Sequence, residues 1–150
     1  MNAKGQPSAG CGYAVQGQPA PMLEVALHAL RRAGSVPQAL PACNGSTCAW
    51  VRDIAECLSR QTCRAAVLFC DDPELACCLA NKIAGIRAAS VSSVAQANRA
   101  LEDLGANLLI MEMAGRTYFE FKALLALVGS ATCPPGIACA LTELDGHAHR

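Results

Sequence analysis

The residues best placed for chemistry follow a continuous apolar run, AAVLFC at residues 65–70. Such a run is typical of a strand that is buried on both faces of a parallel sheet, and Cys70 ends it. In folds with such strands, ligands bind at the carboxyl ends of the strands, so Cys70 lies where chemistry usually takes place. The same position also suits an inert buried thiol, because cysteine packs as a small hydrophobe.

Two carboxylates, Asp71 and Asp72, come directly after Cys70. Two adjacent carboxylates could act as a general acid and a general base. The sequence Asp72-Pro73 instead favours a helix start, with Asp72 as the N-cap and Pro73 at the first helical position. We therefore predict a cap at Asp72 and keep proton transfer by the two carboxylates as the alternative.

The chain has ten cysteines among its 150 residues. None of them forms a Cys-x-x-Cys motif, which argues against a thiol redox protein. The close pairs lack the usual zinc spacings, so no metal site is predicted. These pairs are Cys43/Cys48, Cys57/Cys63, Cys77/Cys78 and Cys133/Cys139. Since the N-terminus lacks the apolar core of a secretory signal, we expect reduced thiols and a cytoplasmic protein.

The elements that must position Cys70 alternate between strand and helix patterns. Strands are predicted at 10–15, 35–40, 65–70, 85–91 and 107–111. Helices are predicted at 22–33, around 50–58, at 73–84, at 94–104 and at 118–128, the last in the chain. Strands that start roughly 20–30 residues apart leave room for one crossover helix each, and hence for parallel pairing. We predict a three-layer α/β fold, a Rossmann-like sandwich with a mainly parallel five-stranded sheet.

This fold is expected to occupy residues 10–150, after a flexible N-terminal arm at 1–9. Pro37 requires that the second strand lie at a sheet edge or that Pro37 itself lie at a strand end. Gly34 and Gly105 are predicted to end the first and fourth helices. Arg87 lies on a predicted strand, and a buried arginine needs a partner, for which Asp53 is the candidate. The predicted buried faces are Leu23, Ala26, Leu27, Leu30 and Ala33 in the first helix, Leu75, Cys78, Leu79 and Ile83 in the third, and Val94, Ala97, Leu101 and Leu104 in the fourth.

The central segment 66–89, AVLFCDDPELACCLANKIAGIRAA, resembles the ribose-5-phosphate isomerase B family, which includes the galactose-6-phosphate isomerase subunits. That family reads Cys-Gly-Thr-Gly-x-Gly, then five residues, then Asn-Lys-x-x-Gly-Ile-Arg-Ala-Ala. Cys70 precedes Asn81 by the family's separation, and Ala106-Asn107 also fits. The ending GHAHR at 146–150 looks like a truncated form of the family's C-terminal Gly-Arg-His-x-x-Arg. The residues that match one for one are Asn81, Lys82, Gly85, Ile86, Arg87, Ala88 and Ala89.

The resemblance implies an aldose–ketose sugar-phosphate isomerase that works through a cis-enediolate and needs no cofactor. Cys70 would be the base that moves the proton between the two carbons. Glycine N–H groups after the cysteine would hold the oxyanion, and histidine and arginine side chains the phosphate. The resemblance also implies a homodimer, or a hetero-oligomer with a paralogue.

The chain departs from the family pattern around Cys70. Residues 71–75 read Asp-Asp-Pro-Glu-Leu in place of Gly-Thr-Gly-x-Gly, and the family's Asp-His pair falls on Gln16 and Gly17. A family histidine falls on Ser92, and one phosphate arginine falls on Gly146. We therefore expect weak or lost isomerase activity, with a non-catalytic partner subunit or binding module as the alternative. The candidate substrate-binding residues are Gln16, Asp71, Asp72, Asn81, Lys82, Ser92 and Arg150.

Composition excludes other classes of protein. Hydrophobic residues make up 53% of the chain and charged residues 16%, against a usual charged share of about 25%. With 12 basic and 12 acidic residues, no basic stripe for nucleic acid is visible. No apolar run reaches the roughly 18 residues of a membrane span. So few charges on a small domain favour an oligomer, most simply a homodimer.

Overall fold

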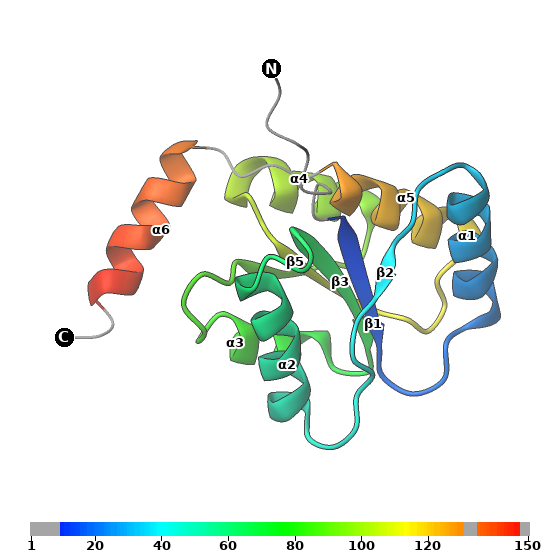
Figure 1. Cartoon of the computed structure of the whole chain (residues 1–150), viewed down its shortest axis with the longest axis horizontal. Coiled ribbons are helices and arrows are strands. Elements are labelled where there is room, and N and C mark those ends of the chain that lie inside the picture. Colours follow the sequence, from blue (N-terminus) through cyan, green and yellow to red (C-terminus); the bar gives the residue numbers. More distant parts are fainter. Residues whose placement is uncertain (1–9, 131–134, 148–150) are drawn as a thin grey trace.

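The computed structural model describes residues 10–130 and 135–147, and the predicted arm at 1–9 lies outside them. Five strands form one sheet in the order β2-β1-β3-β5-β4, and every neighbouring pair is parallel (Figure 1). The predicted fold class is confirmed. The strands are β1 (Cys11–Val15), β2 (Gln38–Ala39), β3 (Ala65–Cys70), β4 (Ala88–Ser90) and β5 (Leu108–Glu112).

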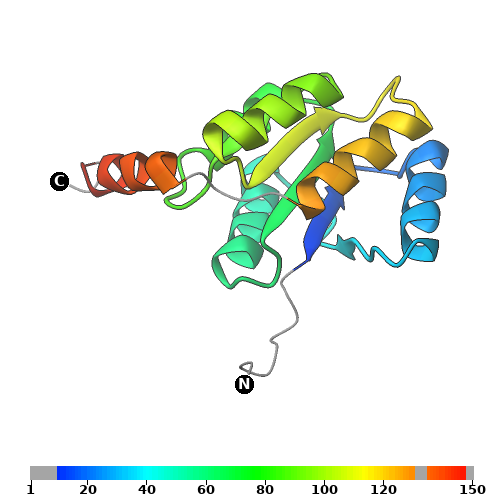
Figure 2. The same ribbon diagram turned by 90° about the horizontal axis from the view of Figure 1, so that it is seen from above.

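Helices cover both faces of the sheet, as Figures 1 and 2 show. One layer holds α1 (Pro21–Arg32), α4 (Val94–Leu104) and α5 (Tyr118–Gly129). The other holds α2 (Thr47–Ser59) and α3 (Pro73–Ala80). A sixth helix, α6 (Pro135–His147), stands apart from the sheet.

The central strand β3 connects the two halves of the core. All six of its residues are buried, as the apolar run predicts. Side chains alternate along a strand, so Val67 and Phe69 pack with α1 and α5, while Leu68 and Cys70 pack with α2 and α3. Phe69 meets Phe121 edge-to-face, with ring centroids 5.3 Å apart. This packing fixes where the carboxyl end of β3 lies.

Several predicted element ends are confirmed. The Asp72 carboxylate accepts a hydrogen bond from the Leu75 N–H at 3.0 Å, so Asp72 is the N-cap of α3. Gly34 and Gly105 follow α1 and α4 with φ of 89° and 58°, which are left-handed conformations that glycine adopts without a Cβ clash. The short strand β2 lies at the sheet edge, where Pro37 before it is tolerated.

The predicted buried face of α3 is wrong. Leu75 and Cys78 are exposed and Leu79 and Ile83 are half-buried, while Ala76 and Ala80 are fully buried. Bulky side chains suggest a core face, but here the small alanines allow α3 to approach the sheet closely. Leu104 of α4 is likewise 50% exposed, and Ala33 caps α1 outside the core.

The third helix and the fourth strand are both shorter than predicted. α3 ends at Ala80, because Asn81 caps it and its side chain turns to the backbone of Ala88. Pairing with β5 therefore begins only at Ala88. Arg87 does not pair with Asp53, since its guanidinium donates to the carbonyl oxygens of Gly105 at 2.8 Å and Gly85 at 3.4 Å.

The sequence does not predict the helix α6, because residues 135–147 show no stripe of apolar residues at helical spacing. Its Leu144 is 64% exposed. The Asp145 carboxylate accepts a hydrogen bond from the Gly85 N–H at 3.2 Å, which ties α6 to the loop before β4. Among the described residues, no helix is both long and apolar enough to cross a membrane.

Candidate active site

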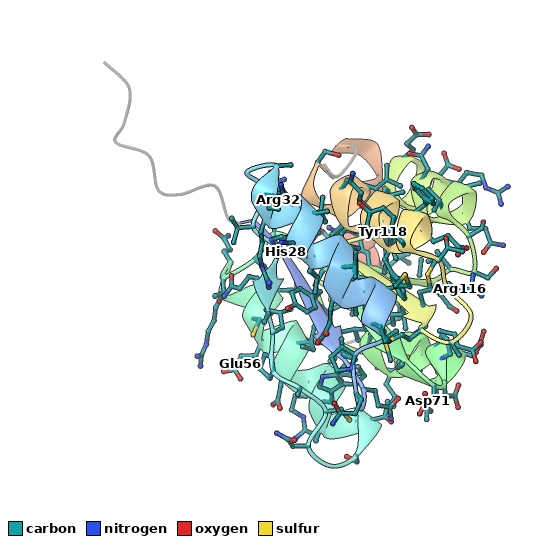
Figure 3. All side chains as sticks on the ribbon, turned by 90° about the vertical axis from the view of Figure 1, so that its right-hand side faces the viewer. His28, Arg32, Glu56, Asp71, Arg116 and Tyr118 are labelled. Atoms are coloured by element: carbon teal, nitrogen blue, oxygen red, sulfur yellow. The ribbon has the colours of Figure 1, made fainter. Side chains whose placement is uncertain are left out.

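The carboxyl ends of β3, β5 and β4 surround a small cavity of about 140 Å³. This is the edge of a parallel sheet where ligands bind in folds of this class. Figure 3 shows two of its lining residues, Asp71 and Arg116, on the same side of the molecule. The polar side chains that line the cavity are Asp71, Glu74, Ser90, Ser92, Glu112 and Arg116.

Cys70 adjoins the cavity in sequence but is turned away from it. Its side chain is 2% exposed and packs with the cluster beneath α2 and α3. Burial raises the pKa of the thiol to about 11, the Asp72 N–H that donates to the sulfur opposes this, and the carboxylates of Asp71, Asp72 and Glu74 raise it further. At neutral pH the sulfur is therefore a protonated thiol and not a nucleophilic or basic thiolate.

Three backbone N–H groups after Cys70, those of Asp71, Asp72 and Leu75, are used by the chain itself. The Asp71 N–H donates to the Gln16 side-chain oxygen at 2.9 Å, which bridges the ends of β3 and β1. Pro73 has no N–H to offer. The Leu75 N–H donates to the Asp72 carboxylate. These groups consequently do not form an open nest of donors for a developing oxyanion.

The opposite wall of the cavity comes from the ends of β4 and β5. The Ser90 hydroxyl donates to the Glu74 carboxylate at 3.4 Å. Ser92, which precedes α4, is held by that helix, because its N–H and hydroxyl both donate to the Gln96 side-chain oxygen at 2.8 and 2.9 Å. The hydroxyls of this wall are thus already oriented before any ligand arrives.

Arg116 is a site residue that the sequence analysis missed. Its Nη1 donates to the Ser92 carbonyl oxygen at 2.6 Å and lies 3.5 Å from the Glu120 carboxylate. Its Nε is buried and has no hydrogen-bond partner among the described residues. The available signal was its position, since Gly115-Arg116 comes shortly after the carboxyl end of β5, where sites of this fold class form.

The structure brings only some of the predicted binding residues together. Asp71 and Ser92 line the cavity. Gln16 and Asp72 bind the backbone of the loop beside it.

Two of the other candidates lie elsewhere. The Asn81 amide exchanges two hydrogen bonds with the Ala88 backbone, at 2.9 and 2.8 Å. Lys82 lines a separate groove of about 540 Å³ between α2 and α3. Arg150, the third, lies outside the described residues.

Comparison with known proteins agrees with this architecture. Residues 46–129, more than half of the chain, match the family described as ribose/galactose isomerase. No curated protein sequence matches the chain. Three similar solved structures, all ribose-5-phosphate isomerases B, show the same fold.

The Thermotoga maritima structure is 15% identical, with a TM-score of 0.73 over 91% of this chain and 98% of that chain. The Mycoplasma genitalium structure, which has bound ribulose-5-phosphate, is 16% identical, with a TM-score of 0.70 over 93% and 97%. The Anaplasma phagocytophilum structure is 20% identical, with a TM-score of 0.69 over 93% and 99%. At these identities the structures establish the fold, and the family match extends across α2, β3 and the loop after Cys70. The chain therefore belongs to the ribose/galactose isomerase family.

Proposed function

We propose that this chain is a divergent sugar-phosphate isomerase homologue whose strand-end site performs aldose–ketose isomerisation only weakly. Cys70 carries whatever proton transfer remains, moving a proton between the two carbons of a cis-enediolate. Asp71 and Ser92 are the substrate contacts in this proposal. Ribose 5-phosphate turnover is then at least about 10³-fold below that of an enzyme with an intact loop, since losing a single oxyanion donor costs about 10²–10³.

The occupied loop after Cys70 is the observation that supports this proposal. Isomerisation develops negative charge on a substrate oxygen, which must be met by donors that are free beforehand. Here the N–H groups of Asp71 and Leu75 are bonded within the chain, and Pro73 has none. Three nearby carboxylates add an unfavourable field for an oxyanion.

A non-catalytic homologue, acting as a partner subunit or a binding module, is the second candidate. The state of Cys70 favours it, because a thiol with a pKa of about 11 is ionised to only about 10⁻⁴ at pH 7. A base that is so rarely charged contributes little to catalysis at physiological pH. The two candidates differ in whether any turnover depends on Cys70.

A turnover assay with a panel of aldose phosphates distinguishes them. The chain, its Cys70→Ala variant and a Cys78→Ala control are assayed beside an intact family enzyme. Cys78 is an exposed cysteine of α3 that does not line the cavity. Weak turnover that vanishes only in Cys70→Ala supports the weakened isomerase. Turnover that is absent throughout supports the non-catalytic homologue, and turnover near that of the family enzyme contradicts both.

A further inference from the structure

We propose that the groove between α2 and α3 is the surface on which a second copy of this chain docks, with the two α2 helices antiparallel across a two-fold axis. This interface is independent of the proposed function, because the groove includes neither Cys70 nor the residues of the strand-end cavity. Two features of the groove support it: its apolar floor and the order of the charges along α2.

On its α3 side, the groove is lined by bulky apolar side chains that do not enter the core. The two helices lie side by side on one face of the sheet (Figure 1), and α3 turns Ala76 and Ala80 inward, where both are fully buried. Leu79 and Ile83, four residues apart, instead line the groove and are half-buried. Leu75, four residues before Leu79, is 46% exposed. An apolar stripe left open to solvent in this way is typical of a surface that another protein covers.

On its α2 side, the groove is lined along almost the whole helix. The lining residues recur at the spacing of one helical face, and they are Cys48, Val51, Arg52, Ala55, Glu56 and Ser59. The uncharged members of this face are small or medium-sized, so a second helix can approach it closely. The groove has a volume of about 540 Å³, which side chains of a docked helix can enter.

The two charged residues of this α2 face have opposite signs. Arg52 and Glu56 are four residues apart, and both are exposed. Arg52 forms no ion pair in the described part of the chain. The Glu56 carboxylate contacts Arg60 through its Oε1 atom, in an exposed pair of a kind that contributes little to stability. The other carboxylate oxygen of Glu56 can therefore accept from a second cation.

A second α2 helix is complementary to this order of charges. Across a two-fold axis, if residue i of one copy contacts residue j of the other, then j also contacts i. An axis that passes between Arg52 and Glu56 in an antiparallel pair thus places Arg52 of each copy opposite Glu56 of the other. Two ion pairs form at once, on either side of the apolar contact.

An acidic helix of another protein fits the groove less well. Arg52 and Lys82 would attract such a helix, but Glu56 on the same face would repel it. Helix α2 itself carries both signs at the required spacing. The charges therefore favour a second copy of the chain as the occupant.

The test is sedimentation velocity of the full chain over a series of concentrations. We expect the unmodified chain to form a dimer at micromolar concentration. Arg52→Glu places carboxylates opposite each other and Glu56→Arg places guanidinium groups opposite each other, so each should raise the dimer dissociation constant at least about tenfold. Both substitutions in one chain exchange the two signs, which should return the constant to within about threefold of the unmodified value.

A mixture of the two single variants tests the antiparallel arrangement itself. One variant is acidic and the other basic at both positions, so an equimolar mixture should form a heterodimer although each variant alone dissociates. The matched controls are Arg99→Glu and Glu102→Arg, which reverse exposed charges of α4 outside the groove. Neither control should change the dissociation constant.

The apolar floor is tested without a change of charge. Leu79→Ala removes apolar surface from the groove, so the dissociation constant should rise at least about fivefold. Leu104→Ala is its control, because Leu104 of α4 is 50% exposed and lies outside the groove. If circular dichroism shows that Leu79→Ala does not fold, the charge variants, which are all at exposed positions, still decide the question.

Three results would overturn the inference. The first is a chain that stays monomeric over the whole series of concentrations. The second is a dimer that Arg52→Glu and Glu56→Arg leave unchanged, or that the α4 controls weaken equally. The third is weakening by the single variants that neither the double variant nor the mixture reverses. None of these results depends on turnover of ribose 5-phosphate, so the proposed function is tested separately.

Discussion

The surroundings of the sulfur decide the chemistry of Cys70. The residue ends β3, where the sequence resemblance implies a proton-transferring cysteine. Its thiol is nonetheless buried beneath α2 and α3, and its pKa is raised by that burial and by three carboxylates. The environment of Cys70 is therefore that of a structural cysteine.

The reactivity of Cys70 should rise only at strongly alkaline pH. We expect its alkylation rate in the native protein to titrate with a pKa of about 11, above the ordinary 9.0 of a cysteine. Asp71→Asn should lower this pKa because it removes a like charge near the thiolate. Mass spectrometry of the Cys70 peptide after timed iodoacetamide treatment gives the profile.

Asp53→Asn is the matched control for this experiment, since Asp53 is an exposed carboxylate on α2 and is not among the causes of the shift. It should leave the profile unchanged. A native profile with its midpoint at or below pH 9 would contradict the account of Cys70.

Single residues differ in how readily the sequence predicts them. Asp72 is predictable as a cap, because an acidic residue before a proline is a local signal that needs no tertiary information. Arg116 is not, because its role arises only when the ends of β4 and β5 bring it to Ser92. The orientation of Cys70 depends on the register of β3 between two helical layers, which the sequence also leaves open.

At the scale of the elements, the start of α3 depends on its cap. Asp72→Ala removes the acceptor of the Leu75 N–H, so we expect the free energy of unfolding to fall by about 1 kcal/mol. Asp53→Ala serves as the control and should stay within about 0.5 kcal/mol of the unmodified chain. Chemical denaturation of both variants measures the difference. Equal losses in the two variants would show that Asp72 is not a stabilising cap.

The junction between α3 and β4 depends on Asn81. Asn81→Ala removes both hydrogen bonds to the Ala88 backbone, and each contributes about 0.5–1.5 kcal/mol. We expect a loss of roughly 1–3 kcal/mol in a denaturation experiment. The neighbouring Lys82→Ala, an exposed control, should cost little. A loss below about 0.5 kcal/mol for Asn81→Ala would contradict this stabilising role of its side chain.

The elements were predictable in proportion to the strength of their local pattern. The buried run of β3 and the stripe of α1 at Leu23, Ala26, Leu27 and Leu30 are confirmed. The face of α3 was misjudged because its buried residues are small alanines, whose burial comes from close packing and not from size. The start of β4 was misjudged because the side chains of Asn81 and Asn107, 7 and 20 residues away along the chain, hold the backbone of 87–88.

At the scale of the whole molecule, we expect a dimer. Few charges cover the surface, Phe119 and Leu144 are 76% and 64% exposed, and α6 stands apart from the sheet (Figure 2). Exposed apolar surface of this kind is typical of proteins that associate. Light scattering during size-exclusion chromatography should give about twice 15.6 kDa at micromolar concentration. A mass of 15.6 kDa under these conditions would contradict the expectation.

The central claim is that the N–H groups after Cys70 donate to groups of the chain itself. The protein would then have the fold of an isomerase but not its catalytic rate. The most direct test is kcat/KM for ribose 5-phosphate, measured for this chain and for an intact family enzyme in one assay. The account predicts a value that is undetectable or at least about 10³-fold lower. A value within tenfold of the family enzyme that is abolished by Cys70→Ala would contradict it.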